Sequence, residues 1–180
     1  MFQRFFGRRN QANRAVVDAL YGQIVAAARQ PILYSVWAVP DTPLGRFELL
    51  SVHVFLFLHR VRTAAPPLPE IAQDLTDVFF ADVEDALRAF GIGDLGVPKR
   101  MKKLARMFYG RAQAYGAAVD AGDHAALAAA LLRNIRPDAG AWSGAAPLAD
   151  YLLAAYAALS GQAAAGLASG RLHFPPAITT

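Results

Sequence analysis

Hydrophobic side chains recur at intervals of three and four along most of the chain, the spacing that gathers them on one side of an α-helix. Proline, glycine and clusters of polar residues separate these stretches. The pattern predicts an all-α fold, a single compact domain of about six or seven helices. We expect its main helices at residues 11–29, 44–62, 69–90, 98–121, 124–134 and 148–160.

Capping residues mark several of the helix boundaries. Thr42 and Pro43 suit the N-cap and first position of the helix 44–62. Gly122 and Asp123 suit the end of one helix and the N-cap of the next. The stretch LLSVHVFLFL is apolar around most of the helix 44–62, which predicts a central helix surrounded by others. At roughly ten residues it would cover about half of a bilayer's hydrocarbon core, too little to cross a membrane.

Residues 30–43 interrupt the helical pattern with three prolines nearby, yet they remain apolar. We expect an irregular connection whose side chains pack onto the helices, with a short strand as the alternative. The side chains expected to pack inward are Tyr34, Val36, Trp37 and Val39.

The two ends of the chain differ from its middle. Residues 1–10 mix aromatic and basic side chains, a composition suited to a membrane interface, although a frayed terminus is equally consistent with it. Residues 11–169 form the helical domain, and residues 170–180, with HFPP, predict an extended strap or a disordered tail. The candidate membrane-contacting residues are Phe2, Arg4, Phe5, Phe6, Arg8 and Arg9.

The sequence FGIGDLG contains a literal G-x-G-x-x-G at Gly91, Gly93 and Gly96. Such a motif binds a dinucleotide only where a strand precedes it, because the glycines then turn the chain beneath the pyrophosphate. Here the end of the helix 69–90 precedes it. We therefore interpret Gly91 as a left-handed helix cap, and the motif as a connection between two helices.

The helix from residue 98 carries a dense group of cations on the side opposite its apolar stripe. A cationic face of this kind suits nucleic-acid phosphates, anionic lipid or an acidic protein, or it is simply solvated. With Tyr34 and Trp37 added as aromatic contacts, the candidate client- or lipid-binding residues are Lys99, Arg100, Lys102, Lys103, Arg106, Tyr109, Arg111, Tyr34 and Trp37.

The composition narrows the chemistry further. The chain has no cysteine, which excludes disulfides, thiolate metal sites and a cysteine nucleophile. His53 and His59 lie six residues apart, on different sides of one helix, so they cannot chelate together. With 55 % hydrophobic residues and a net charge of +4, the chain suits apolar and anionic partners. We expect no active site, no cofactor and no bound metal.

Two longer blocks carry a family resemblance: QPILYSVWAVPDTPLGRFELLSVHVFLFLHR and DVFFADVEDALRAFGIGDLGVPKRMKKLARMFYGRAQAY. Together with the closing HFPP, they resemble the ubiquinol–cytochrome c chaperone family, over about residues 21–134. The resemblance implies an all-α, non-catalytic assembly chaperone of ubiquinol–cytochrome c reductase, with newly made cytochrome b as its client. Transfer of the small partner protein of mitochondrial members is doubtful, because the chain looks like a bacterial member without a transit extension.

On this basis we expect a chaperone attached to the cytoplasmic face of the inner membrane, with an anionic membrane surface as its second partner. Two other functions stay open. The basic helix 98–111 could serve a nucleic-acid-binding module, although no nucleic acid is expected because base-reading side chains do not accompany the cations. His53 or His59 could serve a haem-handling protein.

Overall fold

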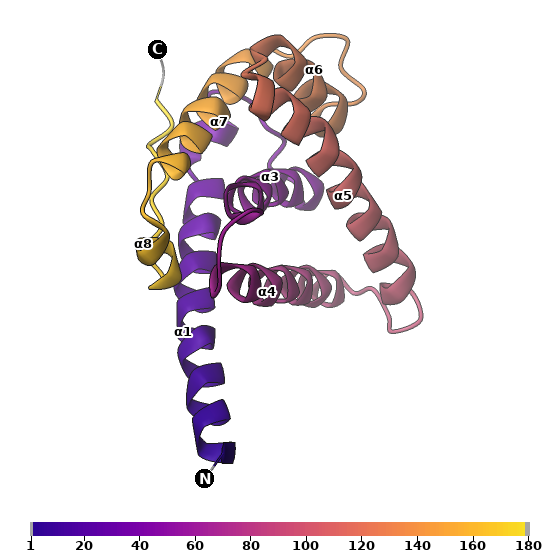
Figure 1. Cartoon of the computed structure of the whole chain (residues 1–180). Coiled ribbons are helices and arrows are strands. Elements are labelled where there is room, and N and C mark those ends of the chain that lie inside the picture. Colours follow the sequence, from indigo (N-terminus) through magenta and orange to yellow (C-terminus); the bar gives the residue numbers. More distant parts are fainter. Residues whose placement is uncertain (1, 179–180) are drawn as a thin grey trace.

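The computed structural model describes the backbone of residues 2–178 and the side chains of residues 13–178. Within this range the chain forms helices and no strand, which confirms the all-α prediction (Figure 1). The two shortest helices, α2 and α8, have five residues each. The helices are α1 (Phe2–Ala28), α2 (Pro31–Ser35), α3 (Pro43–Val61), α4 (Leu68–Ala89), α5 (Val97–Ala121), α6 (His124–Ile135), α7 (Ala145–Ser160) and α8 (Ala164–Ala168).

Helix α3 is the central element that the sequence predicted. It packs against α1, α4, α5, α6 and α7, and Figure 1 shows it in the middle of the bundle. From Phe47 to Phe57 every residue except Leu50 is buried, including the polar residues Glu48, Ser51 and His53. A helix enclosed on all sides has no polar face, which explains the continuous apolar run in the sequence.

The predicted caps are present. The Thr42 hydroxyl accepts a hydrogen bond from the Gly45 amide at 3.2 Å, and Pro43 occupies the first turn of α3. Gly122 ends α5 with a φ of 61°, a left-handed conformation that glycine adopts without strain. The Asp123 carboxylate then accepts from the Ala126 amide at 2.9 Å and begins α6.

Two local expectations were wrong. Helix α1 begins at Phe2 rather than near residue 11. Val36 is 53 % exposed, because the turn after α2 directs its neighbours Trp37 and Val39 inward instead. Phe90 directly follows the last turn of α4 and is 63 % exposed.

The C-terminal segment after α8 is an extended strap, one of the two forms predicted for it. The side-chain amides of two glutamines hydrogen-bond to backbone N–H groups of this segment, as a neighbouring strand would do in a sheet. The Gln23 carbonyl oxygen accepts the Leu172 amide at 2.9 Å, and the Gln30 carbonyl oxygen accepts the Ala177 amide at 2.7 Å. The side chain of Leu172, within the strap, is buried. The strap thus closes over α1, far away in sequence (Figure 1).

Candidate functional site

An apolar groove lies where the end of α1, α2, the start of α3 and the end of α4 meet, with Leu104 of α5 as part of its wall. Its volume is about 410 Å³. Two large apolar side chains that line it are half or more exposed, Leu44 at 50 % and Phe90 at 63 %. Further lining residues are Val25, Ala28, Tyr34, Pro43, Phe47, Leu50, Val83, Ala86 and Leu87, with Arg29, Arg46 and Asp82 adding charge.

Tyr34 and Trp37, proposed together from the sequence, occupy different environments. Tyr34 lines the groove, and its hydroxyl donates to the Ala28 carbonyl at 2.9 Å, which fixes the ring against the end of α1. Trp37 is 4 % exposed and packs against Tyr151 with ring centroids 5.9 Å apart. Trp142 also donates its indole N–H to the Trp37 carbonyl at 2.7 Å. Tyr34 therefore forms part of the groove wall, whereas Trp37 belongs to the core.

The first turns of α5 present a cationic face. The cations are exposed, lie opposite the buried side chains Val97 and Phe108, and make no ion pair with any side chain of residues 13–178. Tyr109 is 59 % exposed at the margin of this face and packs edge-on against Phe108, 5.2 Å between centroids. The cations of this α5 face are Lys99, Arg100, Lys102, Lys103 and Arg106.

Arg111, assigned to the same face from its charge, points the other way. It lies three residues after Phe108 and four before Tyr115, on the buried side of α5. Its guanidinium pairs with the Glu48 carboxylate at 2.5 Å, with the two side chains 14 % and 2 % exposed. Burial raises the pKa of Glu48 to about 7, although the positive charge of Arg111 opposes this shift. Arg111 therefore links α5 to α3 and does not belong to the cationic face of α5.

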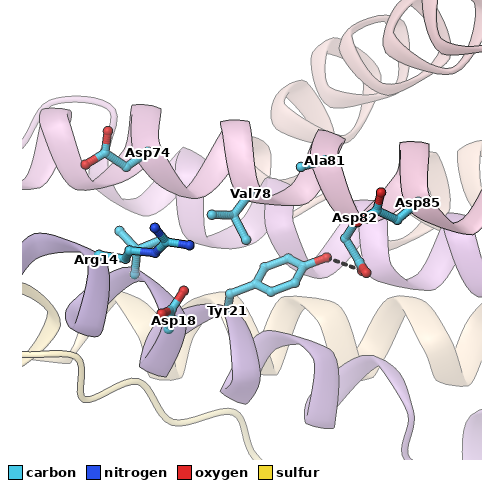
Figure 2. Close-up of a pocket in the computed structure, with 9 residues that line it drawn as sticks. Arg14, Asp18, Tyr21, Asp74, Val78, Ala81, Asp82 and Asp85 are labelled. Carbon is cyan, nitrogen blue, oxygen red and sulfur yellow. Dashed lines mark hydrogen bonds between the residues drawn. The ribbon is translucent and has the colours of Figure 1, made fainter. Parts of the chain in front are cut away.

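A second cavity, of about 670 Å³, lies between α1 and α4 and is mainly acidic (Figure 2). The Tyr21 hydroxyl donates to the Asp82 carboxylate at 2.7 Å, the dashed line in Figure 2. Burial and this neighbouring carboxylate raise the pKa of Tyr21. The contact links α1 to α4, and the carboxylates Asp74 and Asp85 line the same space (Figure 2). Within residues 13–178 no three histidine or acidic side chains gather as a metal site requires.

His53 and His59 are both engaged in structural contacts. His53 is fully buried, and its Nδ1 donates to the Leu49 carbonyl at 2.7 Å. Its Nε2 accepts from the Tyr151 hydroxyl at 3.1 Å. Burial lowers the pKa of His53 to about 4, so the ring is neutral. His59 contacts Asp120 at 2.8 Å between α3 and α5.

The candidate membrane-contacting side chains at the N-terminus, those of Phe2, Arg4, Phe5, Phe6, Arg8 and Arg9, lie outside the described residues. The backbone there continues α1, whose first turns extend past the rest of the bundle in Figure 1. None of the helices in the described part of the chain combines the length and apolar character needed to cross a bilayer.

The sequence did not identify Leu44, Phe90 or Leu95 as candidate contact residues. Leu95 is 99 % exposed in the connection between α4 and α5. A leucine among the glycines of GIGDLG was an available signal, since an apolar side chain in so short a turn has little to pack against. Leu44 had no such signal, because its place in the first turn of α3 looked like part of a buried helix.

Two comparisons with known proteins agree with this architecture, whereas a search of curated proteins found no match. The model of the family described as "Ubiquinol-cytochrome C chaperone" matches residues 35–174. The chain is also similar to a solved structure, that of a Cbp3 homolog from Brucella abortus, with 53 % identity and a TM-score of 0.89. That match covers 97 % of each chain. The chain therefore belongs to the ubiquinol-cytochrome C chaperone family, chaperones of ubiquinol–cytochrome c reductase assembly.

Proposed function

We propose that this assembly chaperone binds newly made cytochrome b at the cytoplasmic face of the inner membrane, without catalysing a reaction. The observation that carries the proposal is the apolar groove bordered by the exposed side chains of Leu44 and Phe90. A soluble surface rarely leaves large apolar side chains uncovered beside a hollow unless a partner covers them.

The chemistry of the groove suits a membrane-protein client. Before insertion, a polytopic protein exposes apolar helices that would aggregate in water. Covering about 200 Å² of such surface in the groove would contribute roughly 5 kcal/mol before the costs of association are subtracted. Such a site gives weak, reversible binding, as a chaperone needs in order to release its client. Arg29 and Arg46 would contact acidic residues that flank the client's apolar segment.

The cationic face of α5 supports the membrane location. Its five cations on one side of a helix attract the phosphates of anionic lipids. Leu104 of α5 lines the groove, whereas Lys99, Lys102 and Arg106 lie on the opposite side of the helix, so α5 would contact the client with one side and the membrane with the other. In this account the N-terminal aromatic and basic residues provide a second membrane contact.

The two other functions considered from the sequence have weaker support. The exposed face of α5 carries no asparagine, serine or threonine beside its cations to distinguish bases. Haem ligation would require His53 or His59 to abandon its present hydrogen bond, and His53 is fully buried. Neither function explains the groove.

The groove is tested by Leu44→Asp. An aspartate in the first turn of α3 is compatible with the helix, but its charge would repel an apolar client segment. We expect cytochrome b synthesised in vitro with membrane vesicles to bind the tagged variant about tenfold less than the native chain. Val36→Asp, which alters an equally exposed apolar residue outside the groove, is the control. Equal capture by both variants would contradict the groove as the client site.

A further inference from the structure

The connection between α4 and α5, residues 90–96, forms a protruding corner of the molecule (Figure 1). Leu95 is 99 % exposed and Phe90 is 63 % exposed. An almost fully exposed leucine gains nothing from the fold itself, so its side chain is free to contact a partner.

The chain is held in this turn by several bonds. Gly91, at φ 79°, donates its amide to the Arg88 carbonyl at 2.9 Å. The Gly96 amide donates to the Gly93 carbonyl at 2.8 Å. The Arg88 guanidinium binds Glu84 at 2.8 Å and also pairs with Asp94 inside the turn. Leu95 is thus held outward by a braced turn, and a partner need not order a loose loop before binding it.

The cationic face of α5 begins directly beside this turn. The guanidinium of Arg100 folds back against the turn. Together with the Ile92 side chain, it lies close to the α-carbon of Gly96. The nearby carboxylates of Glu84 and Asp94 both form ion pairs with Arg88. The turn therefore presents one fully exposed leucine beside a carboxylate that Arg88 neutralises, and the cations behind it make no ion pair with the described side chains.

We propose that the α4–α5 turn is a membrane-inserting wedge: Leu95 enters an anionic bilayer while Lys99, Arg100, Lys102 and Lys103 bind lipid phosphates, and Phe90 stays in the groove. The inference rests on the membrane location in the proposed function, and it assigns residues to that contact. A protruding leucine backed by cations complements the boundary between acyl chains and phosphates. A folded or helical protein partner would instead require a concave or extended surface, which the groove at the other face of α5 supplies.

Leu95→Trp tests insertion directly. The native tryptophans, Trp37 and Trp142, are at most 9 % exposed, so their emission gives a steady background. We expect the emission of the new indole to shift to shorter wavelength when phosphatidylcholine vesicles containing phosphatidylglycerol are added. Brominated acyl chains should quench this emission. Pure phosphatidylcholine should produce neither effect, and the absence of any shift with anionic vesicles would overturn the proposal.

Vesicle sedimentation with Leu95→Asp provides the second test. Leu95 does not line the groove, so its substitution leaves the proposed client site intact. We expect binding to anionic vesicles about tenfold weaker or more, because a charged side chain cannot enter the acyl region. Val36→Asp, carrying the same charge change elsewhere, should bind as the native chain does. Native-like vesicle binding by Leu95→Asp would overturn the wedge.

The same variant separates this proposal from client binding. We expect Leu95→Asp to capture detergent-solubilised cytochrome b like the native chain. Loss of client capture with intact vesicle binding would assign the turn to a protein partner and overturn the wedge. Failure of the native chain to capture cytochrome b, with vesicle binding and the Leu95→Trp shift both present, would contradict the proposed client and leave the wedge standing.

Discussion

At the scale of single residues, burial acts on two ionisable side chains of α3 in opposite directions. The pKa of Glu48 rises from its ordinary 4.5 to about 7, so the folded protein keeps a proton that the unfolded chain releases. The free energy of unfolding then falls as pH rises from about 4.5 to 7. The pKa of His53 falls from 6.5 to about 4, so its contribution to stability is complete above pH 6.5 and is lost towards pH 4.

Because the two slopes oppose each other, Glu48 and His53 together should change the stability of the native chain little between about pH 4.5 and 6.5. Glu48→Gln removes one slope and leaves that of His53. We expect the variant's free energy of unfolding to increase with pH over this range, relative to the native chain, by an amount on the order of 2 kcal/mol. Urea unfolding at several pH values measures it, with the exposed Glu70→Gln as control. Parallel pH profiles for native chain and variant would mean that Glu48 is ionised when folded.

At the scale of elements, the helices follow from local pattern, whereas the surfaces between them do not. The apolar stripes and the caps at Thr42 and Asp123 depend on neighbours in sequence, and they predicted the main helices within a few residues, except for the start of α1. The burial of Arg111 could have been predicted, since its spacing from Phe108 and Tyr115 places it on the stripe. Its partner Glu48 could not, because the pairing depends on how α5 crosses α3.

The connection around α2 shows the same limit. Residues 30–43 show no regular spacing of hydrophobic side chains, so nothing in the sequence indicated which of Val36 and Trp37 would be buried. The groove was also beyond prediction, since it is formed where the ends of α1, α3 and α4 converge. Tyr34 was the one proposed aromatic residue that the structure places in it. The five cations of the α5 face could be assigned to the surface from the sequence, because helical spacing alone separates them from the buried stripe.

One close approach fixes the connection around α2 against α7. Gly144 precedes α7, and a methyl group on its α-carbon would overlap the Trp37 carbonyl and approach the Trp142 indole nitrogen to 2.6 Å. We expect Gly144→Ala to lower the free energy of unfolding by about 1–3 kcal/mol, because the packed backbone must move to admit it. Gly140→Ala, where a methyl group would meet nothing within 4 Å, is the control. Equal stability of both variants in urea would contradict the close packing.

At the scale of the whole molecule, three surfaces lie around the core: the groove, the cationic face and the α4–α5 turn that we propose as a wedge. Leu104 of the groove and the cations Lys99, Lys102 and Arg106 lie on opposite sides of α5, so client and membrane could be bound together. This arrangement suits a chaperone that keeps an apolar chain beside the bilayer into which it inserts.

The most direct test of the account is to purify the tagged, functional chain from its native membranes and identify the bound proteins by mass spectrometry. The account predicts enrichment of cytochrome b over other abundant membrane proteins, and a marked loss of that enrichment in Leu44→Asp. Enrichment of nucleic acid or its binding proteins, with cytochrome b absent, would contradict it.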